Sequence, residues 1–338
     1  MSPEGEVPTE AAKDVGDVIA ETAEQVGKLV PPQDRRKQLI ADHGPTDWFR
    51  DCARRWITAM LADEGVHGPI DSGSRRTKAE IRSREKGTLA GLYVADILLR
   101  EWMPGARFTW TLSEGSRIDS ETCILTIEAS RHQILVCERI ILNILGRLSG
   151  IATNTARWVA NSRIPLAATR KTSWGALDKA AVAIGGGLTH RIHRADALML
   201  KENDLASTAQ DGDIGPTRVR NVLRDIPTES IGAFVTIEVR TLDEALAAAE
   251  AWAERMLESE EKVRLNIMLD NMGAELSRDA VLDIETRGLR EYVTIEASGN
   301  IVFDELDSWQ SSKVDVISTS GLHRAAPPLD LTCIFEGV

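Results

Sequence analysis

Short apolar runs recur through the second half of the chain, and longer helix-like stretches separate them. Residues 242–256 and 276–286 are two such stretches, in which apolar and charged positions alternate with helical spacing. Strands that alternate with helices in this way predict a parallel sheet. The six predicted strands are Ile164–Ala167, Ala197–Leu200, Ala233–Val239, Leu265–Leu269, Tyr292–Ile295 and Val314–Ile317.

Polar residues gather at the carboxyl ends of these predicted strands, which is typical of the active site of a β/α barrel. An open doubly wound sheet is the alternative, but it concentrates its ligands at one switch point. Six units, fewer than eight, predict an irregular, incomplete β/α barrel. The polar residues are Thr169-Arg170-Lys171, Lys201, Glu238, Asp270-Asn271, Glu296-Ala297-Ser298-Gly299 and Ser318-Thr319-Ser320-Gly321.

The first half of the chain mixes helices and strands. A helical pattern over 133–161 links it to the second half. We therefore expect an acidic N-terminal extension over 1–45, a first domain over 46–150 and a barrel domain over 151–338. Further helices are predicted over 48–63 and 91–103, and strands over 79–85, 107–112 and 122–128.

Charge is unevenly distributed along the 338 residues, whose formal net charge is −12. Residues 1–34 carry eight acids and two lysines, whereas residues 163–201 carry seven Lys/Arg and two acids. A basic segment in an acidic protein suggests a pocket for a small anion, rather than a nucleic-acid or membrane surface. A solvated basic helix face would give the same local charge. No run approaches the ~18 apolar residues of a membrane-spanning helix.

The N-terminus and the cysteines favour a cytoplasmic protein. The first residues, MSPEGEVPTEAAKD, contain neither the basic and apolar regions of a secretory signal nor the acid-poor composition of a presequence. The four cysteines form no Cys-x-x-Cys pair, which indicates free thiols in a reducing compartment.

Two acids at the ends of neighbouring predicted strands, Glu238 and Asp270, are the first candidates for chemistry. Paired carboxylates at such a position can bind Mg²⁺ or stabilise a cationic transition state. For each acid alone, a salt bridge is the alternative. Glycine-rich nucleotide loops, a serine-hydrolase elbow and a zinc-protease motif are all absent from the sequence.

Several short motifs resemble those of the quinolinate phosphoribosyltransferase family, and the resemblance covers about residues 46–332. Their number, order and spacing together make the resemblance specific, and Lys86–Gly91 fits the N-terminal domain of the family. The motifs are Glu138-Arg139 with Leu142-Asn143 and Arg147–Thr153, Thr169–Thr172, Gly185-Gly186-Gly187 with His190-Arg191, Lys201 with Asn203, Glu238-Val239, Leu269-Asp270-Asn271, Glu296–Gly299 and Ala326–Asp330.

The resemblance implies an N-terminal α/β sandwich domain, an irregular β/α barrel and a homodimer or larger assembly of dimers with shared active sites. It also implies transfer of phosphoribosyl from phosphoribosyl pyrophosphate to quinolinate. Carbon dioxide and pyrophosphate leave, and nicotinate mononucleotide enters NAD biosynthesis. Mg²⁺ is the implied cofactor.

The same resemblance implies roles for individual residues. Catalytic roles are implied for Lys171, Lys201, Glu238 and Asp270, the two acids also being the expected Mg²⁺ ligands. Ser298-Gly299 and Ser320-Gly321 match the residues at the phosphate end of the family's substrate site. The implied contacts to the acceptor acid come from Thr169, Arg170, Lys171, His190, Arg191, Lys201 and, from the partner subunit, Arg139.

The sequence departs from the family pattern near the expected substrate. Ala168 stands in place of Asp, Thr189 in place of Asn, Trp174 in place of Pro, Asp204 in place of His, and Asn300 in place of Gly. The 319–324 loop also differs, and its Arg324 is a possible phosphate contact. The acceptor base therefore stays open. A paralogous transferase for another aromatic acid or base, and a catalytically silent metabolite-binding relative, are the alternatives.

Overall fold

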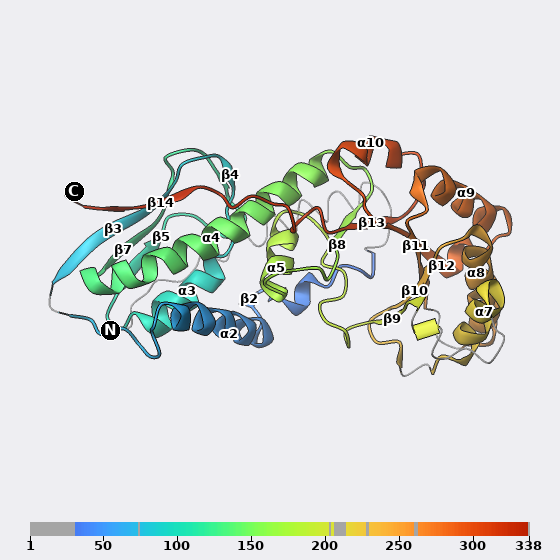
Figure 1. The fold of residues 1–338 in the computed structure, drawn as a ribbon, viewed down its shortest axis with the longest axis horizontal. Coiled ribbons are helices and arrows are strands. Elements are labelled where there is room, and N and C mark those ends of the chain that lie inside the picture. The colour runs from blue at the N-terminus through green and yellow to red at the C-terminus, as the bar shows by residue number, and fades with distance from the viewer. Residues whose placement is uncertain are drawn as a thin grey trace.

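The computed structural model describes residues 31–336 apart from residues 74, 203, 206–213, 228–229 and 260–262. Residues 1–30 of the predicted extension, and Asn203 of the sequence motif, lie outside the described residues. Figure 1 shows an elongated molecule with a small sheet domain at one end and a curled sheet at the other. The long helix α4 (Arg131–Ala160) connects the two.

The first domain is built on a four-stranded antiparallel sheet, with strand order β14-β3-β7-β5. Alternate residues of β3 and β7 are buried beneath the helices, as expected for a sheet with one covered face. The elements are α2 (Asp47–Asp63), β3 (Arg76–Ser83), β4 (Gly87–Thr88), α3 (Leu92–Trp102), β5 (Arg107–Trp110), β6 (Arg117–Ile118), β7 (Cys123–Ser130) and β14 (Leu331–Phe335).

Strand β14 corrects the predicted boundary of the barrel domain. Residues 331–335 were expected in the barrel, but they pair with β3 of the first domain. The chain reaches that sheet along α4, where Leu329 donates its backbone N–H to the carbonyl of Gly146 at 2.8 Å. The small residues Gly146 and Gly150 allow this close approach of two backbones.

The second domain is a parallel six-stranded sheet, with strand order β8-β13-β12-β11-β10-β9 among the described residues. Consecutive strands pair from β9 to β13, and the last strand pairs with the first. This order is that of a barrel opened only between β8 and β9, and it excludes the doubly wound alternative. The predicted incomplete β/α barrel is confirmed.

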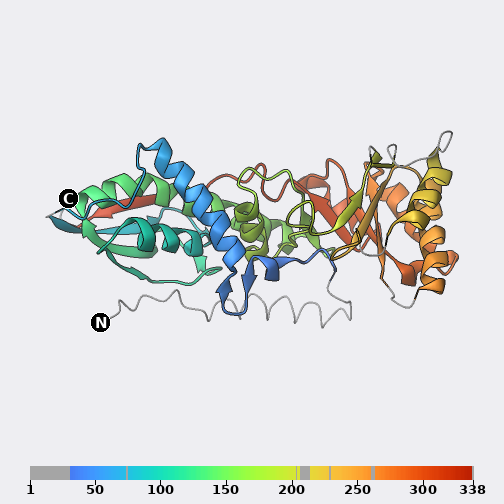
Figure 2. The same cartoon turned by 90° about the horizontal axis from the view of Figure 1, so that it is seen from below.

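The barrel strands follow the six predicted apolar runs within a few residues, and helices cover the outside of the sheet (Figure 2). The strands are β8 (Leu166–Ala168), β9 (Leu198–Leu200), β10 (Val235–Val239), β11 (Leu265–Asp270), β12 (Val293–Ser298) and β13 (Val316–Thr319). The helices are α5 (Ala176–Ile184), α7 (Gly215–Asp225), α8 (Leu242–Glu258), α9 (Gly273–Thr286) and α10 (Leu306–Trp309), with short turns η3 (Arg290–Tyr292) and η4 (Phe303–Glu305).

Residues 31–45, the described end of the extension, are packed against the barrel and the first domain. They form η1 (Arg36–Gln38), β1 (Ile40–Ala41) and β2 (Gly44–Pro45). The side chain of Gln33 is fully buried and hydrogen-bonds to Asn266 of β11 and to Glu296 of β12. Figure 2 shows this dark-blue segment reaching the middle of the molecule beside the barrel.

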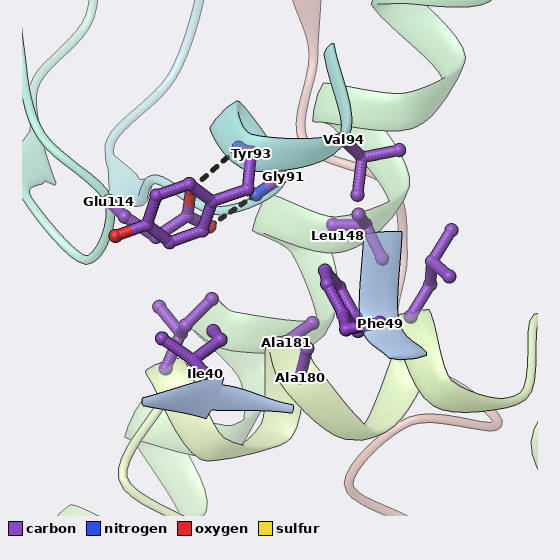
Figure 3. Close-up of a pocket in the computed structure, with 11 residues that line it drawn as sticks. Ile40, Phe49, Gly91, Tyr93, Val94, Glu114, Leu148, Ala180 and Ala181 are labelled. Atoms are coloured by element: carbon purple, nitrogen blue, oxygen red, sulfur yellow. Dashed lines mark hydrogen bonds between the residues drawn. The ribbon is translucent and has the colours of Figure 1, made fainter. Parts of the chain in front are cut away.

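Figure 3 shows where the two domains and β1 meet, around a cavity of about 10 Å³. This volume admits no more than one water molecule. The buried carboxylate of Glu114 accepts hydrogen bonds from the backbone N–H of Gly91 at 2.6 Å and of Tyr93 at 3.3 Å. Burial raises the pKa of Glu114 to about 7 despite these bonds. We assign it a structural role at the start of α3.

All four cysteines are free, as predicted, and Cys52 and Cys137 are buried. None of the described helices combines the length and the apolar composition needed to span a membrane.

Gly150→Ala tests the contact between α4 and the chain that returns to the first domain. An added Cβ would collide with the carbonyl oxygen of Pro327 and lie 2.9 Å from Cα of Pro328. We expect the free energy of unfolding to fall by about 1–3 kcal/mol, as for other overpacked sites. Gly68→Ala is the control, because a Cβ there meets nothing within 4 Å. Urea unfolding of both variants measures the effect, and equal stability would contradict the packing described.

Candidate active site

A cavity of about 680 Å³ opens at the carboxyl ends of the barrel strands. Strand-end residues from all six strands reach it, which is the arrangement the sequence predicts. Its lining contains Thr169, Arg170, Lys171, His190, Arg191, Met199, Lys201, Glu238, Met268, Asp270, Asn271, Ser298, Gly299, Asn300, Ile301, Val302, Ser318, Thr319, Ser320, Gly321 and Arg324.

One wall of the cavity is cationic. Arg170 and Lys171 follow β8 and are exposed, whereas Arg191 is buried between α5 and β9. Burial, together with the nearby charges of Arg170 and Arg194, lowers the pKa of the Arg191 guanidinium. The positive charges of this wall repel one another, so the wall favours an anionic ligand.

His190 is held in a single orientation at the base of this wall. Its backbone has a φ of 52°, a left-handed conformation that costs a non-glycine residue free energy. Its Nδ1 accepts the backbone N–H of Arg191 at 2.8 Å, so the proton of a neutral ring lies on Nε2. Nε2 is 3.2 Å from both carboxylate oxygens of Glu296.

Glu296 is fully buried beneath the cavity. Burial alone would raise its pKa, but the neighbouring His190 and the amide of Asn266 hold that pKa below its usual value. The carboxylate therefore stays an anion that orients His190. Glu296 belongs to one of the motifs that carry the family resemblance, but the sequence predicted no role for it.

Lys179 of α5 is a second buried charge that sequence reasoning missed. It is 1% exposed, and its ammonium donates to the backbone carbonyls of Ala168 and Thr189. Burial, and then the charges of Arg170 and Arg191, lower its pKa to about 7. Ala168 and Thr189 are two of the positions that depart from the family pattern, and it is their backbone carbonyls, rather than a carboxylate of the described residues, that bind this lysine.

A second part of the lining, which we call the acidic wall, contains Glu238 and Asp270, and each of these acids has a cationic partner. Lys201 donates a hydrogen bond to Glu238, and Arg240 lies 3.4 Å from Asp270. Arg240 also pairs with the exposed Glu202 at 2.6 Å. Within the described ranges, no three His, Cys, Asp or Glu side chains cluster as a metal site. Two carboxylates do fit Mg²⁺ that is bound mainly by substrate phosphates.

The end of β12 and the loop after β13 form the third side of the cavity. Gly299 has a φ of 103°, and a Cβ there would lie 2.8 Å from the backbone nitrogen of Asn271. Asn300, at a φ of 51°, donates to the side-chain oxygen of Asn271 at 3.2 Å. Asparagine tolerates this backbone conformation, so the loss of a glycine at 300 leaves the turn intact.

Loop 319–324 is anchored from two directions. Thr319 donates to the carbonyl of Ile301 at 2.9 Å, and Asn154 of α4 donates to the carbonyls of Gly321 and Leu322 at 2.9 Å. Ser320, Gly321 and Arg324 thereby line the cavity from a fixed backbone.

The structure brings together every predicted site residue except Arg139. That arginine is exposed on α4, outside the cavity lining, and no ion pair joins it to another described residue. Met199 and Met268 also line the cavity and were not predicted. Strand alternation could have found them, because each lies two residues before a predicted site residue, Lys201 or Asp270.

The fold and the site define an α/β enzyme with an anion pocket at the mouth of an open barrel. The quinolinate phosphoribosyl transferase N-terminal domain model matches residues 58–149, and the C-terminal domain model matches residues 151–333. The chain belongs to the quinolinate phosphoribosyltransferase family, which confirms the resemblance seen in the sequence.

Individual relatives agree with this family assignment. A probable carboxylating nicotinate-nucleotide pyrophosphorylase of Methanothermobacter thermautotrophicus is 36% identical over 297 residues, covering 85% of this chain and 99% of the relative. A decarboxylating quinolinate phosphoribosyltransferase of Nicotiana glauca is 31% identical and covers 76% of this chain and 73% of the relative. The solved nicotinate-nucleotide pyrophosphorylase of Francisella tularensis is 28% identical, with a TM-score of 0.69 and coverage of 85% and 97%.

Lys179→Met tests the buried ammonium through the pH dependence of stability. The pKa of Lys179 is about 7 in the folded protein against an ordinary 10.5, so the unfolded chain holds the extra proton between these values. The free energy of unfolding of the wild type, relative to that of the variant, should therefore rise from pH 7 to pH 10.

Urea unfolding at pH 7, 8.5 and 10 measures this difference. Lys37→Met is the matched control, since Lys37 is exposed and its replacement should leave the pH profile parallel to wild type. A difference between wild type and Lys179→Met that stays constant over this range would contradict the lowered pKa.

Proposed function

We propose that this chain transfers phosphoribosyl from phosphoribosyl pyrophosphate to quinolinate. The products are nicotinate mononucleotide, carbon dioxide and pyrophosphate, as in NAD biosynthesis. The observation that supports this most directly is the cavity itself, whose lining combines a group of cations with two carboxylates. That combination suits both an anionic acceptor and a developing ribosyl cation.

The cationic wall supplies the acceptor site. Quinolinate is a planar dianion, and the guanidinium groups of Arg170 and Arg191 can donate paired hydrogen bonds to its carboxylates. Lys171 adds a further charge from the same side. Held in this way, the ring nitrogen is fixed in position, which lowers the entropic part of the barrier. The same cations stabilise the electron density that loss of the 2-carboxylate leaves on the ring.

The acidic wall supplies the donor site. Glu238 and Asp270 lie on adjacent strands, where their charges favour the positive ribosyl group as its bond to pyrophosphate breaks. Lys201, hydrogen-bonded to Glu238, is placed to neutralise the leaving group. Mg²⁺, held by the two acids and by the phosphates, would neutralise the departing pyrophosphate.

The turn at Ser298-Gly299 and loop 319–324 supply the phosphate end. Gly299 has a positive φ and no side chain, so backbone N–H groups there can approach an anion closely. Arg324 adds a charge from the same loop. These groups are placed to bind the 5′-phosphate of the donor.

Product analysis tests the proposed reaction. Purified protein, phosphoribosyl pyrophosphate, Mg²⁺ and a panel of pyridine acids are combined, and the products are identified by mass. We expect nicotinate mononucleotide from quinolinate and none from nicotinate. Turnover of a different acid would identify a paralogous transferase, and ligand binding without turnover would identify a silent relative.

Neutralising the acids tests their role in the chemical step. Glu238→Gln and Asp270→Asn should each lower kcat by about ten- to a hundredfold, because charge that stabilises the transition state is lost. Quinolinate binding should change little, since its dianion meets the other wall. Asp270→Asn should also require more Mg²⁺ for half-maximal rate, and chelation with EDTA should stop turnover until Mg²⁺ is restored.

Glu202→Gln is the matched control, because Glu202 meets Arg240 at the surface and does not line the cavity. Steady-state kinetics and calorimetric binding of quinolinate separate the two effects. Variants of both acids that weaken quinolinate binding at an unchanged kcat would contradict the roles assigned.

Subunit complementation tests whether Arg139 completes the site of a partner subunit. Arg139→Ala and Glu238→Gln proteins should each be nearly inactive alone. Mixed and allowed to exchange, they should recover about a quarter of wild-type activity, because half of the dimers then hold one intact site. Unmixed Arg139→Ala carried through the same procedure is the control. Proven exchange without recovery would show that Arg139 does not act across subunits.

A further inference from the structure

The segment 31–36 makes polar contacts inside the open barrel. Gln33 is fully buried, and its side-chain nitrogen lies 2.9 Å from Oδ1 of Asn266 and 3.1 Å from Oε2 of Glu296. Two residues further on, Arg35 contacts the loop that precedes β9. A peripheral segment that buries an amide among barrel strands gives up the hydration of that amide, so the bonds it forms inside must offset this cost.

The side-chain amide nitrogen of Gln33 uses both of its N–H groups in hydrogen bonds. The two N–H groups of that nitrogen go to Asn266 and Glu296, and its Oε1 accepts no bond from the described residues. Asn266 in turn donates from its own amide nitrogen to Thr236 at 3.1 Å and to Glu296 at 2.7 Å. Every donor of both amides therefore has an acceptor, and the carboxylate of Glu296 is fixed from below.

The same carboxylate holds His190 of the substrate pocket. Oε2 of Glu296 is shared by Gln33, Asn266 and His190, and its Oε1 also lies 3.2 Å from His190 Nε2. His190 has a left-handed backbone, which persists only where its surroundings determine it. Gln33 is thus linked through the carboxylate of Glu296 to His190, which lines the cavity.

Arg35 fixes the loop around His190 independently of Gln33. Its backbone N–H donates to Oγ1 of Thr189 at 2.8 Å, and its guanidinium contacts Asp196 at 2.9 Å. Asp196 also accepts the backbone N–H of Ile192 at 2.9 Å, so it ties the two ends of the loop together. The segment therefore contacts both sides of the His190-Arg191 pair.

We propose that segment 31–36 holds the loop before β9 in place through Thr189 and Asp196, and that Gln33 is a positioning residue that orients His190 through Glu296. The segment lies outside both family-model matches, which begin at residue 58. It meets the barrel at Thr189, a position where this sequence departs from the family pattern. The consequence for quinolinate rests on the proposed function, whereas the orientation of His190 does not.

Gln33→Met tests this role, because methionine keeps the length of the side chain and removes its donors. Loss of one hydrogen bond that orients His190 should raise the quinolinate dissociation constant by about three- to tenfold. The KM for phosphoribosyl pyrophosphate should stay within twofold, because His190 lies on the acceptor wall. The control Lys37→Met, four residues away and exposed, should change neither value. Circular dichroism and urea unfolding establish that each variant is folded.

A double-mutant cycle separates positioning from a general packing effect. If Gln33 acts through His190, Gln33→Met should weaken quinolinate binding in the wild type but add nothing in a His190→Ala background. Equal weakening in both backgrounds would overturn the proposal, as would wild-type affinity in folded Gln33→Met.

The third measurement needs no substrate. With ¹⁵N-labelled histidine, NMR detects the Nε2 proton of His190, assigned by its loss in His190→Ala. Gln33→Met should shift or broaden this signal, and Lys37→Met should leave it unchanged. An unaltered signal in Gln33→Met overturns the proposal. If the wild type fails to bind quinolinate, the proposed function fails, and this measurement still decides the role of Gln33.

Discussion

Gathering several cations around one cavity costs electrostatic free energy that the rest of the barrel must offset. Arg170, Lys171 and Arg191 line one wall, and Lys179 is buried behind them. The protein reduces this repulsion in two ways. The pKa of Lys179 falls to about 7, so part of its charge is given up near neutral pH. Glu296 keeps its charge beneath the pocket and offsets the remainder.

The open barrel determines where these charges can be placed. A closed barrel fills its interior with layers of side chains. Here β8 and β9 do not pair, and the loop containing Thr189 to Asp196 occupies the gap. The polar side chains inside, such as Asn266 and Glu296, need partners that a packed apolar interior would not supply. The interior therefore admits the buried amide of Gln33, which bonds to both of these side chains.

Sequence reasoning recovered the elements whose signals are local. Each barrel strand is a short apolar run, and Glu238 and Asp270 could be placed because strand ends in a parallel sheet meet at one edge. It could not recover β14, because residues 331–335 look like any other strand and their partner β3 lies far away along the chain. Gln33 was missed for a related reason. A single amide in an acidic extension has no pattern, and its importance follows only from the buried acceptors it meets.

Helix α4 explains why one predicted site residue lies apart from the others. Asn154, near its C-terminal end, holds the loop that contains Gly321 at the cavity, whereas Arg139 lies fifteen residues earlier. At 1.5 Å per residue, this spacing places the two about 22 Å apart along the helix. An arginine side chain cannot cover that distance, so Arg139 is excluded from the cavity of its own chain. The helix that anchors the loop at the active site therefore presents this cation away from the cavity.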